Sequence, residues 1–95
     1  MSDQDFSEPV RIPITDVLDL HSVPPRDMQE VVEEYLIEAH RLGYKALRII
    51  HGRGIGVQRA NVQAFLATHS LVAGYTDAPE DRGGRGATLV RLRRP

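Results

Sequence analysis

The fold of this chain is decided by residues 17–54, VLDLHSVPPRDMQEVVEEYLIEAHRLGYKALRIIHGRG. Residues 17–21 alternate apolar and polar side chains with period two, which predicts a strand. Residues 26–42 place apolar side chains at three- and four-residue spacings and acidic side chains largely on the other faces, which predicts an amphipathic helix. Residues 46–51 are mostly apolar and predict a second, largely buried strand. Two strands separated by a helix predict a parallel pair with a right-handed crossover.

The rest of the chain extends this unit. Residues 57–69 predict a second helix, and residues 71–76 and 87–92 predict two further strands that pair antiparallel. A polar, glycine-containing loop over residues 77–86 separates these strands. The element order is therefore β-α-β-α-β-β. We expect an α/β protein of the two-layer α+β sandwich type, with a mixed sheet of about four strands and both helices on one face.

The chain of 95 residues has the length of a single domain. We expect residues 1–9 to be a flexible lead-in and residues 10–95 to form the domain. Residues 10–14 predict an extra strand. It would lie at the edge of the sheet, because Pro13 has no backbone N–H to donate to a neighbouring strand. An exposed edge leaves two oligomeric states open, a monomer and a weak homodimer.

Composition excludes several classes of protein. Cys is absent, which excludes a disulfide scaffold, a thiolate metal site and a Cys nucleophile. No apolar run approaches the ~20 residues of a membrane span, and the acidic N-terminus is not that of a signal peptide. We expect a soluble, cytoplasmic protein with no membrane contact.

Charge is divided unevenly along the chain. Residues 1–40 hold ten acidic and two basic side chains, whereas residues 41–95 hold ten basic and three acidic ones. All the basic residues except Lys45 are Arg, whose planar fork suits phosphate. This division points to nucleic acid as a partner. Charge complementarity within a small fold explains it equally well.

Both predicted core strands end in histidine, at His21 and His51. If the strands are parallel, both imidazoles lie at the carboxyl edge of the sheet, where ligands of open α/β sheets bind. Asp19 shares a strand face with His21, so its carboxylate can orient the ring and raise its basicity. These three residues are our candidate catalytic groups. A hydrogen-bonded structural role is the alternative for each histidine taken singly. Asp19 and His21 are also the candidate ligands of a divalent metal, although two ligands make a poor site.

Two glycine-rich loops offer an anion site. The first joins a strand to a helix, whose N-terminus presents free amide N–H groups and a positive dipole end. This loop matches neither the Walker A nor the dinucleotide-binding pattern. The alternative interpretation is therefore a plain turn without a ligand. The candidate phosphate-binding residues are Gly52, Arg53, Gly54, Gly56, Arg59, Gly83, Gly84, Arg85 and Gly86.

Further arginines fall on the predicted strands. Arg91 and Arg93 alternate with Val90 and Leu92, so they share the opposite face of the last strand. Arg48 joins them if its side chain faces away from the helices. The alternative is that these arginines only solubilise an exposed sheet face.

Three motifs together resemble the Smr (small MutS-related) domain. They are Leu18-Asp19-Leu20-His21, His51-Gly52-Arg53-Gly54 and Gly83-Gly84-Arg85-Gly86-Ala87-Thr88, in the order and spacing of that family. The resemblance spans about residues 10–93 and is that of a short, stand-alone member. It implies a two-layer α/β sandwich similar to the C-terminal domain of a bacterial translation initiation factor.

The resemblance also implies activity on nucleic acids, by nicking of DNA, cleavage of RNA, or binding. The first motif is linked to cleavage and the second to nucleic-acid binding and activity. Three positions depart from the family pattern. Ser22 stands where Gly is usual, Gln58 where Leu is frequent, and Arg85 where related short chains often have Trp. These departures bear on the substrate preference more than on the fold.

Three functions are therefore weighed. The first is a structure-selective endonuclease that hydrolyses DNA or RNA phosphodiesters, with Mg²⁺ or Mn²⁺ as the candidate cofactor or with no metal. The second is a non-catalytic module that binds branched DNA or stalled RNA and ribosome structures. The third, a protein-interaction domain that uses its acidic helix, has the least support. DNA repair, recombination and translation quality control all remain open as settings.

Overall fold

The computed structural model describes residues 14–54 and 56–94. In chain order its elements are β2 (Val17–Asp19), a 3₁₀ turn (Pro25–Asp27), α1 (Met28–Arg41), β3 (Ala46–Ile50), α2 (Val57–Thr68), β4 (Val72–Asp77), two 3₁₀ turns (Glu80–Arg82 and Gly84–Gly86) and β5 (Ala87–Leu92). The predicted order β-α-β-α-β-β is confirmed. The expected lead-in over residues 1–9 lies outside the described residues. So does the expected strand over residues 10–14, apart from Ile14, which belongs to no strand.

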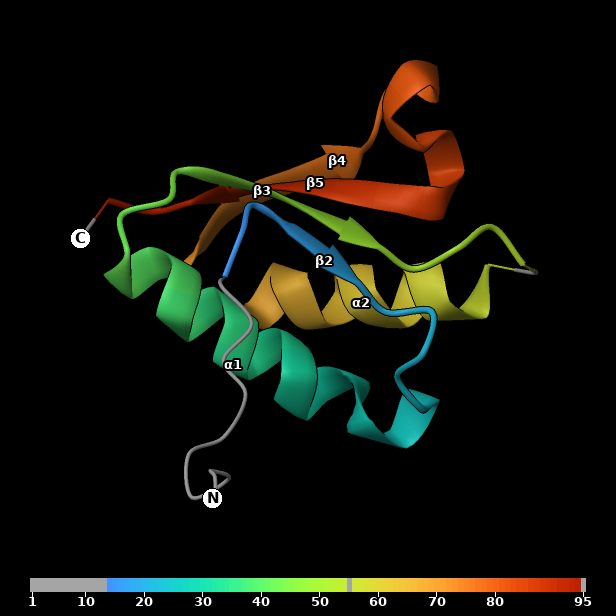
Figure 1. Cartoon of the computed structure of the whole chain (residues 1–95), viewed down its shortest axis with the longest axis horizontal. Coiled ribbons are helices and arrows are strands. Elements are labelled where there is room, and N and C mark those ends of the chain that lie inside the picture. The colour runs from blue at the N-terminus through green and yellow to red at the C-terminus, as the bar shows by residue number, and fades with distance from the viewer. Residues whose placement is uncertain (1–13, 55, 95) are drawn as a thin grey trace, which may run out of the picture.

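The four strands form one mixed sheet in the order β2-β3-β5-β4. β2 runs parallel to β3, while β5 lies between β3 and β4 and is antiparallel to both. Both helices cover the same face of this sheet (Figure 1). The expected two-layer sandwich is therefore confirmed, and β2, β3 and β4 all end at one edge. None of the helices in the described ranges is long and apolar enough to cross a bilayer.

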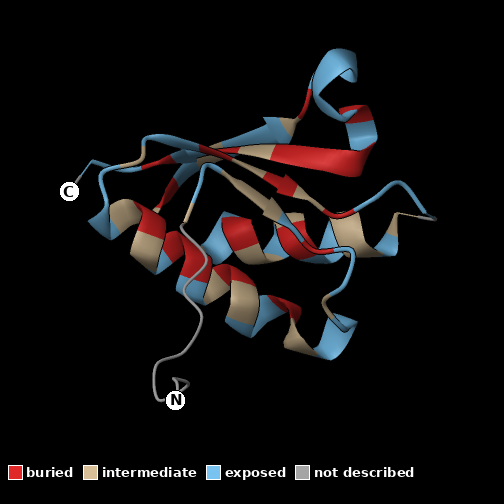
Figure 2. Ribbon diagram, in the orientation of Figure 1, coloured by how far each residue is buried: buried red, intermediate tan, exposed pale blue. Residues whose placement is uncertain are grey.

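The core lies between the sheet and the two helices. The predicted apolar stripe of α1 contributes Val32, Leu36 and Ala39, all fully buried. They pack with strand side chains such as Ile49 and Val90. Figure 2 shows the buried segments of both helices on the side that faces the sheet. Burial of a Val, Leu or Ile side chain stabilises the fold by roughly 1.5–3 kcal/mol.

Several predicted boundaries were wrong. The helix expected to end at Leu42 ends at Arg41, and the strand expected through His51 ends at Ile50. The helix expected from residue 26 begins at Met28, because the preceding turn is 3₁₀: the amide of Asp27 donates to the carbonyl of Pro24 at 2.9 Å. The strand expected through His21 ends at Asp19. Its continuation stops because the His21 amide donates to the Asp19 carboxylate at 2.9 Å and not to a strand.

The C-terminal half needs two smaller corrections. β4 begins and ends one residue later than expected and carries an irregularity between Val72 and Gly74. The helix expected to end at His69 ends at Thr68. The loop over residues 77–86 is not simply a polar connection: it contains two 3₁₀ turns, and two of its glycines, Gly84 and Gly86, are buried. The strand over residues 87–92 lies where it was predicted.

Candidate functional site

The ends of β2 and β3 bring the two motif histidines to the same edge of the sheet, as the parallel pairing requires. The amide of Leu20 still donates to the carbonyl of Ile50 at 2.8 Å, so the chains stay side by side up to the histidines. Their environments differ sharply. The side chain of His21 is 76% exposed, whereas His51 is 7% exposed.

Asp19 and His21 form an exposed, oriented pair. One carboxylate oxygen of Asp19 accepts hydrogen bonds from the backbone amide and from Nδ1 of His21, both at 2.9 Å. The hydrogen bond from the His21 amide, followed by the one from its ring, holds the pKa of Asp19 below its usual value. The carboxylate is therefore ionised at neutral pH and Nδ1 carries the proton. Nε2 of His21 lies 3.2 Å from the exposed hydroxyl of Ser22, which can donate a hydrogen bond to it.

His51 is held from both sides within the protein. Its Nδ1 lies 3.1 Å from the carbonyl oxygen of Gly52, which can only accept, so Nδ1 is the donor. Its Nε2 lies 2.8 Å from the hydroxyl of Thr88. Burial lowers the pKa of His51 below its usual value, which favours the neutral ring. Neither nitrogen is free to reach a ligand in this arrangement.

A polar network behind His51 was missed by the sequence reasoning. Gln63 on α2 donates to the hydroxyl of Thr88 and to the carboxylate of Asp77, both at 3.1 Å. Thr88 is fully buried. Its alternation with Val90 and Leu92 on the last strand could have revealed it, because a buried hydroxyl in a core-facing row requires partners. Gln63 and Asp77 carried no comparable signal.

Arg59, an expected phosphate ligand, already has a counter-charge. Its guanidinium group makes a bidentate ion pair with Asp77, with both N–O distances at 2.8 Å. Hydrogen bonds from Arg59, followed by that from Gln63, lower the pKa of Asp77 to about 2. The pair therefore stays ionised at neutral pH. Arg59 is positioned at the site by Asp77, with much of its charge neutralised.

The two glycine loops are tied together. The carbonyl oxygen of Gly86 accepts hydrogen bonds from the amides of His51 and Gly52, at 3.0 and 2.9 Å. The side chain of Arg53 lies along the second loop. A Cβ atom on Gly84 would stand 2.6 Å from its Nη2 atom, and one on Gly86 would stand 3.2 Å from its Cγ atom. The second glycine motif therefore supports Arg53.

These loops enclose a small basic pocket of about 310 Å³. It is lined by Arg53, Gly54, Gly56, Arg59 and Arg85. α2 begins at its wall, with Gly56 as the N-cap and no acidic side chain in the first turn. Its unpaired amides favour an anion there. Five of the nine predicted phosphate ligands thus come together, while Gly52, Gly83, Gly84 and Gly86 lie outside this lining.

The metal expectation rests on Asp19 and His21 alone. Within residues 14–54 and 56–94, no group of three His, Cys, Asp or Glu side chains is arranged to hold a metal ion. Mg²⁺ in proteins is usually held by one or two carboxylates together with substrate phosphates and water. The exposed carboxylate of Asp19 fits that kind of shared coordination.

Comparison with known proteins agrees with these motifs. The family model of the Smr domain matches residues 18–93. The chain is 36% identical over 75 residues to endonuclease MutS2 of Enterococcus faecalis, covering 79% of this chain and 10% of that protein. It is 46% identical over 61 residues to endonuclease MutS2 of Maridesulfovibrio salexigens, covering 64% and 8%. The chain thus spans at most a tenth of the length of these relatives.

Two solved structures have the same fold. The Smr domain of Thermus thermophilus MutS2 superposes with a TM-score of 0.79 at 34% identity, covering 83% of this chain and 99% of that one. YdaL, a stand-alone small MutS-related protein from Escherichia coli, gives a TM-score of 0.79 at 28% identity, covering 86% and 67%. Since the family model covers most of the chain and the fold agrees, this chain belongs to the Smr domain family.

Proposed function

We propose that this chain binds nucleic acid and is a structure-selective endonuclease that hydrolyses phosphodiester bonds. The observation that carries the proposal is the Asp19–His21 pair, whose exposed imidazole is oriented by a carboxylate and whose Nε2 is hydrogen bonded to the exposed, rotatable hydroxyl of Ser22. Support comes from the basic pocket at the same sheet edge and from the name of the related proteins, endonuclease MutS2. Their other domains are absent from the aligned region, so activity of this chain has to be tested directly.

In this proposal, a backbone phosphate lies over the pocket and the start of α2. Arg85 and Arg53, whose Nη2 atom lies 3.3 Å from the exposed carboxylate of Glu80, supply the counter-charges, and Arg59 lines the wall while paired with Asp77. Arg53 or a loop amide stabilises the negative charge that develops on the phosphorane. Nε2 of His21 removes a proton from the attacking hydroxyl or water, and Asp19 holds the ring in the required tautomer.

His51 takes a different place in the proposal from the one expected of it. It was a candidate acid or base, but both ring nitrogens are hydrogen bonded inside the protein. We therefore assign His51 a positioning role. Its ring joins Thr88 on β5 to the first glycine loop, and so helps to hold Arg53 and the pocket in place.

Two chemical routes are compatible with these groups. On RNA, His21 can deprotonate a 2′-hydroxyl without a metal; the 2′-oxygen attacks the adjacent phosphorus, the bond to the 5′-oxygen breaks, and that oxygen takes a proton from water, which leaves a 2′,3′-cyclic phosphate that water then hydrolyses. On DNA, a water nucleophile is better activated by Mg²⁺ or Mn²⁺, which Asp19 would hold together with phosphate oxygens. Such an ion would polarise the phosphate and lower the pKa of its bound water.

The second candidate function is a binding module without catalysis. One observation favours it: the carboxylate of Asp19 accepts a hydrogen bond from the backbone amide of His21, as it would in a purely structural turn. In that case Asp19 and His21 shape the loop, and the basic pocket does the binding.

The test is cleavage of end-labelled RNA, duplex DNA and branched DNA, each with EDTA, Mg²⁺ or Mn²⁺. Wild type is compared with the Asp19→Ala/His21→Ala double variant and with Asp81→Ala, which removes an exposed carboxylate outside the pair. Cleavage by wild type and Asp81→Ala but not by the double variant supports the endonuclease. If no substrate is cut and gel shifts persist in the double variant, the chain is a binding module.

A further inference from the structure

In the described part of the chain both helices lie on one face of the sheet (Figure 1), and the opposite face, called here the open face, carries arginines. Strand register places Arg48 beside Val17 and Leu89, and Arg91 beside Ala46 and Gly74. These rows alternate with the buried core rows that pack against α1 and α2, so they face away from the helices. The expectation that Arg48 and Arg91 share an open face is thereby confirmed.

Charge differs between the two layers. Four glutamates, Glu30, Glu33, Glu34 and Glu38, lie on α1 in the helical layer. In the described ranges, no carboxylate lies within 4.0 Å of a basic nitrogen of Arg48, Arg91 or Arg93. The arginines of the open face therefore have no ion-pair partner in that part of the chain.

Two of these arginines are fixed in place by the sheet. The guanidinium group of Arg91 lies on the backbone of β4 at Gly74, where a Cβ atom would stand 2.8 Å from its Nη2 atom. Arg48 donates from Nη1 to the carbonyl of Arg82 at 3.1 Å, and its buried Nε has no hydrogen-bond partner within the described part of the chain. Charges held in position lose less entropy when they bind a ligand than freely moving ones.

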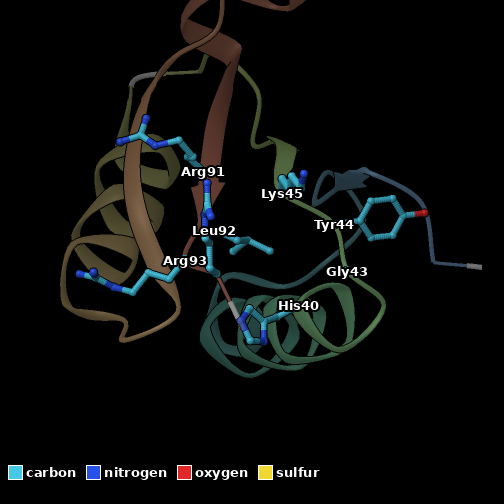
Figure 3. Close-up of a pocket in the computed structure, with 8 residues that line it drawn as sticks. His40, Gly43, Tyr44, Lys45, Arg91, Leu92 and Arg93 are labelled. Carbon is cyan, nitrogen blue, oxygen red and sulfur yellow. The ribbon is translucent and has the colours of Figure 1, made fainter.

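Arg93 continues the row of Arg91 beyond the end of β5. Figure 3 shows both side chains leaving the chain on the same side, away from Leu92. Leu92 instead points toward the cavity of about 560 Å³ that lies between β5 and the end of α1. Arg91 and Arg93 also line this cavity, but their guanidinium groups point away from Leu92 and toward the open face (Figure 3).

We propose that a nucleic-acid strand bound at the loop pocket continues across the open face of the sheet, with its phosphates on Arg48, Arg91 and Arg93. This rests on the proposed function and adds a second contact region to it. β5 has six residues and is about 20 Å long, which matches roughly six phosphates of one strand along a duplex. The partly exposed apolar side chains of Leu89 and Ile50 provide a floor between the charges.

The experiment measures the dissociation constant of a labelled DNA and a labelled RNA over a series of salt concentrations. The variant Arg91→Gln/Arg93→Gln removes two charges from the open face. The matched control Arg26→Gln/Arg41→Gln removes two from the helical layer. We expect the slope of log K against log salt to become shallower by about 1.4–1.8 for the open-face variant, and to be unchanged for the control.

Two further variants separate the possible failures. Arg91→Lys/Arg93→Lys keeps the charge and should keep the wild-type slope. Arg53→Gln/Arg85→Gln tests the loop pocket itself. If only the pocket variant reduces the slope, the open-face contact is overturned while the proposed function stands. If wild type binds neither nucleic acid at low salt, both are overturned.

Discussion

The guanidinium group of Arg53 lies directly against Gly84, at a position where a Cβ atom would come within 2.6 Å of Nη2. Glu80 completes the arrangement, since its carboxylate lies 3.3 Å from the same nitrogen. Gly84 belongs to one glycine-rich loop of the sequence and Arg53 to another, 31 positions earlier. The two motifs therefore act as one unit, in which the second loop determines where the charge of the first one lies.

Gly84→Ala should displace Arg53 and weaken nucleic-acid binding by about one phosphate contact. The slope of log K against log salt should fall by roughly 0.7–0.9. Gly43→Ala is the matched control, because Gly43 also has a positive φ but nothing lies within 4 Å of its added Cβ. Both variants should lose about 1 kcal/mol of stability from backbone strain, but only Gly84→Ala should change binding. Equal binding by Gly84→Ala and wild type would contradict the coupling.

Thr88→Val should destabilise the fold by about 1–3 kcal/mol. The substitution keeps the shape but removes the hydroxyl that Nε2 of His51 and the amide of Gln63 share, so that Nε2 of His51 loses its partner and Gln63 retains only its hydrogen bond to Asp77. Urea unfolding measures the loss. Thr76→Val, on an exposed position of β4, should change the stability by less than about 0.5 kcal/mol. A Thr88→Val loss no larger than that of the control would show that the network adds little.

His51 should make the protein less stable as the pH falls below its usual pKa of 6.5. Because burial lowers its pKa in the folded state, the unfolded chain binds the proton more readily between the two pKa values. Stability from this group is thus fully present above about pH 6.5 and decreases on acidification. Melting temperatures from pH 7.5 to 5 should fall more steeply for wild type than for His51→Gln, which keeps the other three histidines. Parallel curves would contradict this assignment.

Asp77 should make the stability of the fold depend on pH in a more acidic range than His51 does. Its pKa in the folded protein is about 2, against a usual value of 3.8, so its stabilising effect is present above about pH 4 and is lost as the pH falls toward 2. Asp77→Asn should remove this part of the acid transition and lower stability at neutral pH. Acid titration followed by circular dichroism compares it with Asp81→Asn. Asp81 has no ion pair within residues 14–54 and 56–94. The control should retain the wild-type transition.

The order of the helices and strands, and the position of both helices on one face of the sheet, could be predicted from the apolar periodicity of short segments. The apolar stripe of α1 and the alternation in β5 depend only on neighbouring residues, so the sequence predicted both. The parallel β2–β3 pair followed from the helix between the strands, and it correctly placed Asp19, His21 and His51 at one edge. Element ends were less predictable. Asp19 ended its own strand through a side-chain bond that no periodicity reveals.

The sequence by itself determined which residues reach the carboxyl edge, because strand direction and length are local properties. It could not distinguish His21 from His51, since both follow an apolar strand. Only the tertiary structure decided that, among the strands of residues 14–54 and 56–94, β2 lies at the edge of the sheet while β3 lies inside it, next to β5. A residue after an edge strand meets solvent, whereas one after an inner strand meets side chains from β5 and α2. The side chain of His21 is therefore exposed, whereas both ring nitrogens of His51 are hydrogen bonded inside the protein.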